Sequence, residues 1–167
     1  IVVDYTPQWT QAFEQEAAQL QEVLADVLVH LHHIGSTSVP GLAAKPIIDM
    51  IPEVTDLALL DAKTSAMEAL GYEVMGEYGI AGRRYYRKGG DQRTHHIHAF
   101  LQGDPHVKRH LAFRDYLIAH PSVADAYGQL KKEVAERSNN NIEDYCDGKD
   151  PFIKIHEQKA LEWYQKR

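Results

Sequence analysis

One stretch of the sequence combines a glycine, hydroxyl side chains and a carboxylate in an order that suits phosphate chemistry. Gly35, Ser36 and Thr37 follow an alternating apolar segment, and Asp49 comes a few residues after Lys45. Glycine lets the backbone approach a phosphate, hydroxyls and amides donate hydrogen bonds to it, and a carboxylate holds a charge-neutralising metal ion. The pattern predicts a phosphate site, to which Lys45 adds a positive charge unless its stem reaches out to water. A plain turn between two core strands would account for the same residues.

A pair of histidines provides the second chemical signal. Alternate side chains of a strand point to one face, so His96 and His98 in the segment 94–101 are expected about 6–7 Å apart along it. With Asp49 they predict a site for a divalent metal such as Mg²⁺, Mn²⁺ or Zn²⁺, of which imidazole favours the transition metals. Alternatively the histidines bind phosphate or act as a general base, or they are partly buried and hydrogen-bond to the backbone. His95 is expected on the other face, at the surface.

Basic side chains form a third group. Arg84 lies in a predicted strand over residues 83–88, where one face carries alternating basic and aromatic residues that either clamp phosphates or protect an exposed sheet edge. Arg114 is expected to point into the same cleft, and its neighbour Asp115 elsewhere, because adjacent residues of a helix do not share a face. Three other lysines are expected to be solvated, namely Lys131, Lys149 and Lys154.

The segment HIGSTSVPGLAAKPIID at residues 33–49 resembles the signature of the GrpB family. Later segments resemble the family too, around His96-Ile97-His98, at 113–121 and near Tyr145. The resemblance implies a fold similar to that of nucleotidyltransferases, in which a Gly-Ser turn precedes a strand that bears two alternate carboxylates for two metal ions. The family also occurs fused to dephospho-coenzyme A kinase domains, and its own reaction is unassigned.

The sequence departs from the nucleotidyltransferase pattern at the second carboxylate. That residue would fall two positions after Asp49, where the chain has Ile51. Two-metal catalysis needs several anionic oxygens around both ions, so the site is incomplete unless Glu53 or Glu77 joins it. This argues against standard two-metal nucleotidyl transfer.

Composition excludes several classes of protein. A chain of 167 residues with 44% hydrophobic and 25% charged residues predicts one globular domain over residues 1–167. The net charge of −6 opposes binding to duplex nucleic acid and to anionic membranes. No apolar run approaches the ~18 residues of a membrane helix, and a single cysteine, Cys146, allows no internal disulfide. These features predict a cytoplasmic protein, and Cys146 has no evident neighbour that would make it a nucleophile.

The elements that must position these residues follow from periodicity and from helix-capping and turn signals. Three-to-four spacing predicts helices at 7–26, 56–70, 107–119, 122–137 and 151–166, the last with Pro151 in its first turn. Alternation predicts strands at 27–34, 46–52, 72–76, 83–88 and 94–101. Asn139 to Asn141 read as a loop. The fold class is α/β, with a mixed sheet, flanking helices and a C-terminal helical segment.

We therefore expect a nucleotidyltransferase-like domain that binds a nucleotide or another phosphorylated small molecule. Asp49, His96 and His98 would be the catalytic and metal-binding residues, and nucleotidyl or phosphoryl transfer would be the reaction. One alternative is a non-catalytic module that binds a ligand such as a coenzyme A precursor. A second alternative is a one-metal hydrolase built on the same three residues.

Overall fold

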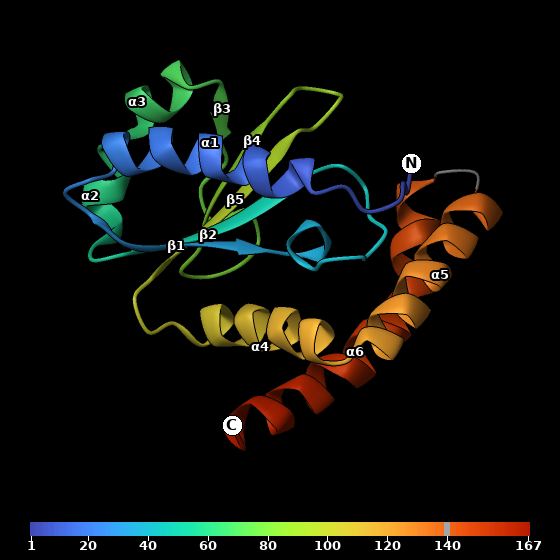
Figure 1. The fold of residues 1–167 in the computed structure, drawn as a ribbon. Coiled ribbons are helices and arrows are strands. Elements are labelled where there is room, and N and C mark those ends of the chain that lie inside the picture. Colours follow the sequence, from blue (N-terminus) through green and yellow to red (C-terminus); the bar gives the residue numbers. More distant parts are fainter. Residues whose placement is uncertain (139–140) are drawn as a thin grey trace.

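A five-stranded sheet with helices on both faces forms the centre of the computed structural model, which describes residues 1–138 and 141–167 (Figure 1). The strands are β1 (Leu28–Ile34), β2 (Ile48–Val54), β3 (Tyr72–Val74), β4 (Arg84–Lys88) and β5 (His95–Leu101). The α-helices are α1 (Gln8–Val23), α2 (Leu57–Asp61), α3 (Thr64–Ala69), α4 (Pro105–Ala119), α5 (Pro121–Arg137) and α6 (Ile142–Gln165). None of these helices is long and apolar enough to cross a membrane.

The strand order is β1-β2-β5-β4-β3. β2 and β5 pair in parallel, whereas the other neighbouring strands are antiparallel. The register sets Asp49 opposite His96 on β5 and opposite Ile34 on β1. The mixed sheet and flanking helices confirm the predicted fold class.

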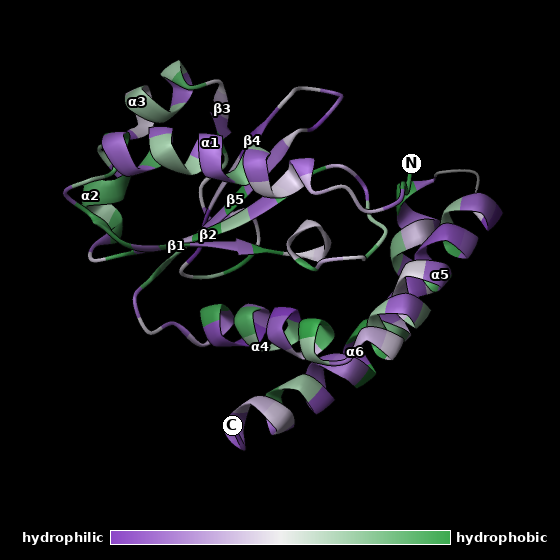
Figure 2. Cartoon of the chain, viewed as in Figure 1, coloured by the Kyte–Doolittle hydropathy of each residue, from purple (hydrophilic) through white to green (hydrophobic). Residues whose placement is uncertain are grey.

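Alternation along the central strands divides their side chains between two hydrophobic cores. Met50 and Ile97 are fully buried against α1, whose Leu20 is also fully buried. On the opposite face, Ile51 and Phe100 pack against residues of α4. Hydrophobic and hydrophilic residues alternate along both α1 and α4, as expected of helices that cover one face of a sheet (Figure 2). Asp49, which alternates with Met50, therefore lies on the α4 face.

The last two helices, α5 and α6, pack against each other and against α4, to the side of the sheet (Figure 1). α6 begins after Asn141, whose side chain accepts a hydrogen bond from the Asp144 amide at 3.1 Å. Pro151 lies inside this helix, so the prediction that it occupies the first turn is wrong. Proline cannot donate a backbone hydrogen bond within the helix, which destabilises it. The packing of Phe152 and Ile153 onto the buried residues of α4 and α5 offsets this loss of stability.

Other predicted bounds change as well, most clearly in two elements. The helix predicted at 56–70 is divided into α2 and α3, because the Thr64 hydroxyl donates to the Asp61 carbonyl at 2.7 Å and takes the place of a helical backbone bond. The strand predicted at 46–52 begins two residues later and runs to Val54, with Pro46 left outside it. The predicted loop at 139–141 lies largely outside the described residues.

A buried carboxylate joins α1 to the sheet. Glu16 is 5% exposed and accepts two hydrogen bonds from the Lys88 ammonium, at 3.0 and 3.2 Å. The Nε2 atom of His95 lies 3.4 Å from the same carboxylate. His95 does face away from His96, but α1 covers it, so the prediction that it lies at the surface is wrong.

Glu16→Ala is expected to destabilise the protein. Loss of the carboxylate leaves Lys88 without its partner, at a cost of about 2–3 kcal/mol, less than for a fully buried pair because the lysine is a quarter exposed. Glu22→Ala, at an exposed position of the same helix, is the control and should change the free energy of unfolding by less than ~0.5 kcal/mol. Urea denaturation measures both, and equal losses would contradict the role of Glu16.

Candidate functional site

The turn after β1 brings the backbone against Asp49. Gly35 has a φ of 72°, and a Cβ atom at this position would lie 2.8 Å from Oδ2 of Asp49. The short 3-10 helix Ser36–Ser38 follows, and the Ser38 hydroxyl donates to the Gly35 carbonyl. Only glycine combines this left-handed backbone with so close an approach. The Gly-Ser turn predicted from the sequence is therefore also a wall of the site.

Asp49 and the two histidines converge as the sequence analysis predicted. Oδ1 of Asp49 lies 3.4 Å from Nδ1 of His96 and 3.4 Å from Nε2 of His98. One ligand atom from each of the three residues lies within 4.8 Å of the others. All three side chains are 18–28% exposed. A carboxylate and two imidazoles in this arrangement fit the ligand set of a Zn²⁺ or Mn²⁺ ion.

Electrostatics favour an ionised Asp49. Burial by itself raises the pKa of Asp49, but hydrogen bonds from His96 and His98 outweigh burial and hold the pKa below its ordinary value.

Arg83 adds a contact that the sequence analysis did not identify, with a guanidinium nitrogen 3.4 Å from Nδ1 of His98. The same guanidinium donates to the Tyr78 carbonyl at 2.8 Å, which fixes its position.

The place of a second carboxylate remains apolar. Ile51 is fully buried in the core beneath α4. Glu53 pairs with His32 at 2.6 Å, and Glu77 accepts from the Gly82 amide at 2.7 Å. Neither glutamate joins Asp49 in the described structure, so the carboxylates of a two-metal site are not assembled here.

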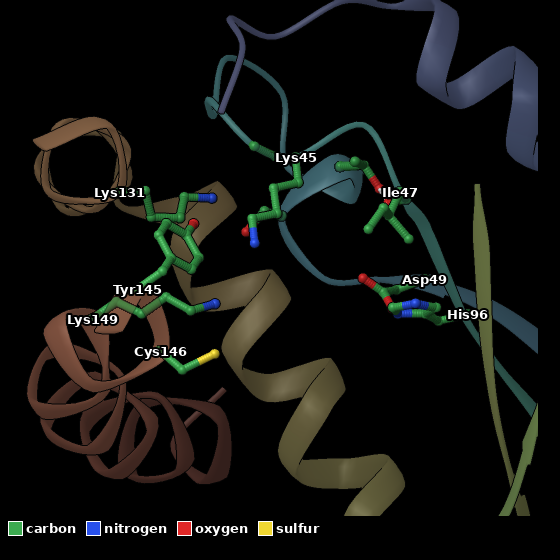
Figure 3. Close-up of a pocket in the computed structure, with 11 residues that line it drawn as sticks. Lys45, Ile47, Asp49, His96, Lys131, Tyr145, Cys146 and Lys149 are labelled. Atoms are coloured by element: carbon green, nitrogen blue, oxygen red, sulfur yellow. Dashed lines mark hydrogen bonds and ion pairs between the residues drawn. The ribbon is translucent and has the colours of Figure 1, made fainter. Parts of the chain in front are cut away.

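A cavity of about 240 Å³ opens beside Asp49, between the sheet and the C-terminal helices. Asp49 and His96 lie on its sheet side, and Lys131, Tyr145, Cys146 and Lys149 lie across from them (Figure 3). The remaining lining residues come from the turn and the loop before β2: Ser36, Thr37, Ala44, Lys45 and Ile47. Lys45 extends from that loop toward the helical side (Figure 3).

Two lysines expected in solvent are instead part of this cavity. Lys131 is 2% exposed, and its ammonium has no hydrogen-bond partner in the described structure. Burial, together with the charge of Lys149, lowers the pKa of Lys131 to about 7. Burial also lowers the pKa of Lys149, and the charge of Lys45 adds to this effect. The prediction that Lys131 and Lys149 are solvated is wrong.

A signal for Lys131 was present in the sequence. Tyr127 and Val134 are on the buried face of α5, and Lys131 falls between them at four-residue and three-residue spacing. A lysine within an apolar stripe is buried once another helix covers that stripe, and α6 does so here. Lys149 has the corresponding position one turn after Tyr145, the buried residue near the start of α6.

The predicted phosphate-binding residues reach the cavity to different degrees. Ser36 and Lys45 line it, and Lys45 places its ammonium 4.2 Å from the centre of the Tyr145 ring. Thr37 also lines it, but its hydroxyl donates to the Ile47 carbonyl at 3.2 Å and contacts Nε2 of His33 at 3.0 Å. Thr37 therefore fastens the turn to the loop before β2.

The two predicted arginines do not line the cavity. Arg84 lies on the α1 face of β4, where it forms an ion pair with Asp61 at 2.8 Å, so the prediction that it binds substrate beside Asp49 is wrong. Arg114 donates to the His33 carbonyl at 3.1 Å and thereby ties α4 to the end of β1. Its Nε also lies 2.9 Å from the Asp115 carboxylate, so these two adjacent residues do contact each other. Their flexible side chains can meet although the Cα–Cβ bonds of adjacent helix residues point in different directions.

Gly35→Ala is expected to disturb both stability and the position of Asp49. Gly41→Ala is the matched control, because Gly41 also has a positive φ, of 83°, but has open space where a Cβ would lie. The backbone alone costs about 1–2 kcal/mol at such a position. Gly35→Ala should lose at least about 1 kcal/mol more by urea denaturation, and losses of equal size would contradict the close contact with Asp49.

Lys131→Met is expected to stabilise the protein, and most strongly below pH 7. The pKa of Lys131 is about 7 in the folded chain and near 10.5 when unfolded, so the unfolded state binds more protons between these values. Wild-type stability should rise relative to the variant by about 1.4 kcal/mol per pH unit across that range. Urea denaturation at several pH values measures the difference. Lys132→Met, at a partly exposed neighbouring position, should show no such slope, and parallel wild-type and Lys131→Met curves would contradict the burial.

Comparison with solved structures places this fold among nucleotidyltransferases. The Cid1 poly(U) polymerase bound to MgATP aligns with a TM-score of 0.56 and 12% identity over 84% of this chain and 46% of that one. A likeness at this identity shows the fold alone. The expectation of a nucleotidyltransferase-like architecture is confirmed.

Several bacterial proteins are more similar to this chain in sequence than the polymerase is. The YqkA protein of Bacillus subtilis is 46% identical over 99% of this chain, which spans 48% of that protein's length. The dephospho-CoA kinase of Mycolicibacterium paratuberculosis is 23% identical, and this chain covers 45% of it. The crystal structure of conserved protein GrpB from Enterococcus faecalis superimposes with a TM-score of 0.95, at 46% identity and 99% coverage of both chains. The family described as GrpB protein matches residues 1–159, and the chain therefore belongs to the GrpB family.

Proposed function

We propose that this domain binds a nucleotide or another phosphorylated small molecule in the cavity beside Asp49, with one divalent metal ion, and transfers a nucleotidyl or phosphoryl group. The observation that carries the proposal is the convergence of Asp49, His96 and His98, of which Asp49 and His96 line that cavity. A metal held there would neutralise phosphate charge. The fold it shares with a nucleotide-bound polymerase and its partial similarity to a dephospho-CoA kinase support this ligand class.

The chain's own residues have distinct roles in this proposal. Asp49 and His96 supply two ligand atoms, and His98 supplies the third. Gly35 leaves room for the backbone beside Asp49, and Ser36 offers a hydroxyl to the phosphate from the same turn. Because Ile51 replaces a second carboxylate, the proposal involves one protein-bound metal rather than two.

One contact favours a second role for His98. If Arg83 donates to Nδ1 of His98, the neutral ring carries its proton on Nε2, which faces Asp49. In that state His98 donates to Asp49 instead of binding a metal, and the pair can pass a proton to or from a ligand. This second candidate function is a proton-transfer site that needs no metal at His98.

Metal titration by calorimetry tests the proposal. Wild-type protein should bind about one Mn²⁺ or Zn²⁺ per chain, and Asp49→Asn and His96→Gln should weaken binding at least tenfold because each removes a ligand. His30→Gln, at an exposed position of β1, is the control. Unchanged binding by Asp49→Asn would overturn the proposed site. Wild-type affinity in His98→Gln together with weak binding by the other two variants would favour the proton-transfer role of His98.

Thermal denaturation with a ligand panel then tests the substrate class. The panel contains nucleotides and coenzyme A precursors, each with and without the metal. A ligand at a hundred times its Kd adds about 2.7 kcal/mol to stability, and this gain should be metal-dependent in wild type and lost in Asp49→Asn. Product analysis over hours with the best ligand separates transfer from binding alone. An unchanged ligand would overturn the catalytic part and leave a binding module.

A further inference from the structure

We infer that the helical side of the cavity, formed by Lys131 and Lys149 with Lys45 beside them, is a subsite for a chain of two or three phosphate groups. The inference rests on the proposed function, because it specifies the ligand of the same cavity. It adds that the ligand carries a diphosphate or triphosphate that extends from Asp49 toward α5 and α6.

Lys131 places a buried positive charge in the lining of the cavity. Its ammonium is almost wholly buried and has no hydrogen-bond partner among residues 1–138 and 141–167, although it lines the cavity and lies 4.5 Å from the centre of the Tyr127 ring. A buried ammonium without an acceptor opposes folding, and the ring face replaces only part of its lost hydration. An apolar residue of similar length would suit the interior of α5 better. An anion in the cavity would provide the missing acceptor.

Three lysine side chains lie in the lining of the same cavity. Lys45 and Lys149 lie 4.2 and 4.9 Å from the centre of the same ring, that of Tyr145. Lys131 and Lys149 interact closely enough that the charge of Lys149 lowers the pKa of Lys131. Three lysines face one carboxylate in the cavity lining, although the whole chain has a net charge of −6. Such a local excess of positive charge is relieved when an anion binds.

The positions of the lysines relative to Asp49 suit an extended anion. The lysines come from α5, from α6 and from the loop before β2, and Asp49 and His96 lie across the cavity from the helical ones (Figure 3). A single phosphate bound to the Asp49 side would leave the helical side uncompensated. The cavity of about 240 Å³ is smaller than the ~300–1,000 Å³ pockets that enclose whole drug-sized ligands. A short phosphate chain suits that space, with the rest of the ligand outside.

Calorimetry with inorganic phosphate, pyrophosphate and tripolyphosphate tests this subsite. In the absence of metal, wild type should bind tripolyphosphate at least tenfold more tightly than orthophosphate. Lys131→Met and Lys149→Met should each weaken tripolyphosphate binding at least tenfold. Lys132→Met is the matched control, because Lys132 is the partly exposed neighbour of Lys131 on the same helix and pairs with Asp4, and it should change the affinity less than twofold.

Thermal denaturation of the same variants separates a ligand-binding role from a structural one. Lys131→Met should raise the melting temperature while it lowers tripolyphosphate affinity, whereas a structural lysine would lower both. Equal affinity for orthophosphate and tripolyphosphate, or wild-type binding by both Lys131→Met and Lys149→Met, would overturn the inference. If Lys131→Met does not fold, Lys149→Met decides the outcome.

The proposed metal site and the phosphate subsite can be overturned separately by these experiments. Tripolyphosphate binding without any metal binding would overturn the proposed metal site and keep the subsite, and the reverse result would overturn only the subsite. Competition of tripolyphosphate with ATP and with dephospho-coenzyme A then distinguishes a nucleoside triphosphate from a diphosphate-bearing coenzyme A precursor as the source of the phosphate chain.

Discussion

The parallel pairing of β2 with β5 brings Asp49 beside His96 at the centre of the sheet, and the geometry of the site depends on this pairing. β1 and β4 flank the two strands, and helices cover both faces, so the register cannot shift without moving a whole hydrophobic face. Asp49 and His98 are 49 positions apart in the chain and meet only because of it. Asp49, His96 and His98 thus project from paired strands rather than from loops.

Two groups of buried charges in this molecule differ in whether they have partners. On the α1 face, Glu16 satisfies Lys88 and lies close to His95, so the buried charges there have partners. On the other face, the Lys131 ammonium has none in the described structure. Buried polar groups in folded proteins are nearly always paired, so the unpaired Lys131 ammonium beside the cavity supports the proposed phosphate subsite. This contrast within one molecule is the physical basis for assigning the two clusters different roles.

The apolar residue at position 51 sets this chain apart from the two-carboxylate pattern of nucleotidyltransferases. Ile51 contributes to the core beneath α4, where an ionised carboxylate would be strongly destabilised without a metal. In the proposed site, His96 and His98 would supply nitrogen ligands in a nearby position, and nitrogen ligands favour a different class of metal from an all-carboxylate site. The proposed chemistry therefore rests on this set of side chains and not on the two-carboxylate pattern.

Local patterns in the sequence determined the turn at Gly35, the common face of His96 and His98, and most helices and strands, because backbone periodicity and turn preferences act over a few residues. The same alternation correctly separated Arg84 from its neighbours in β4 but could not tell which face the cleft occupies. Only the tertiary structure decided that Arg84 lies on the α1 face, that Asp49 reaches both histidines, and that Lys131 is buried and Lys149 partly buried. Each of these outcomes depends on which strands pair and which helix covers which stripe. The apolar stripe that contains Lys131 is visible in the sequence of α5, but its burial depends on the packing of α6 against it.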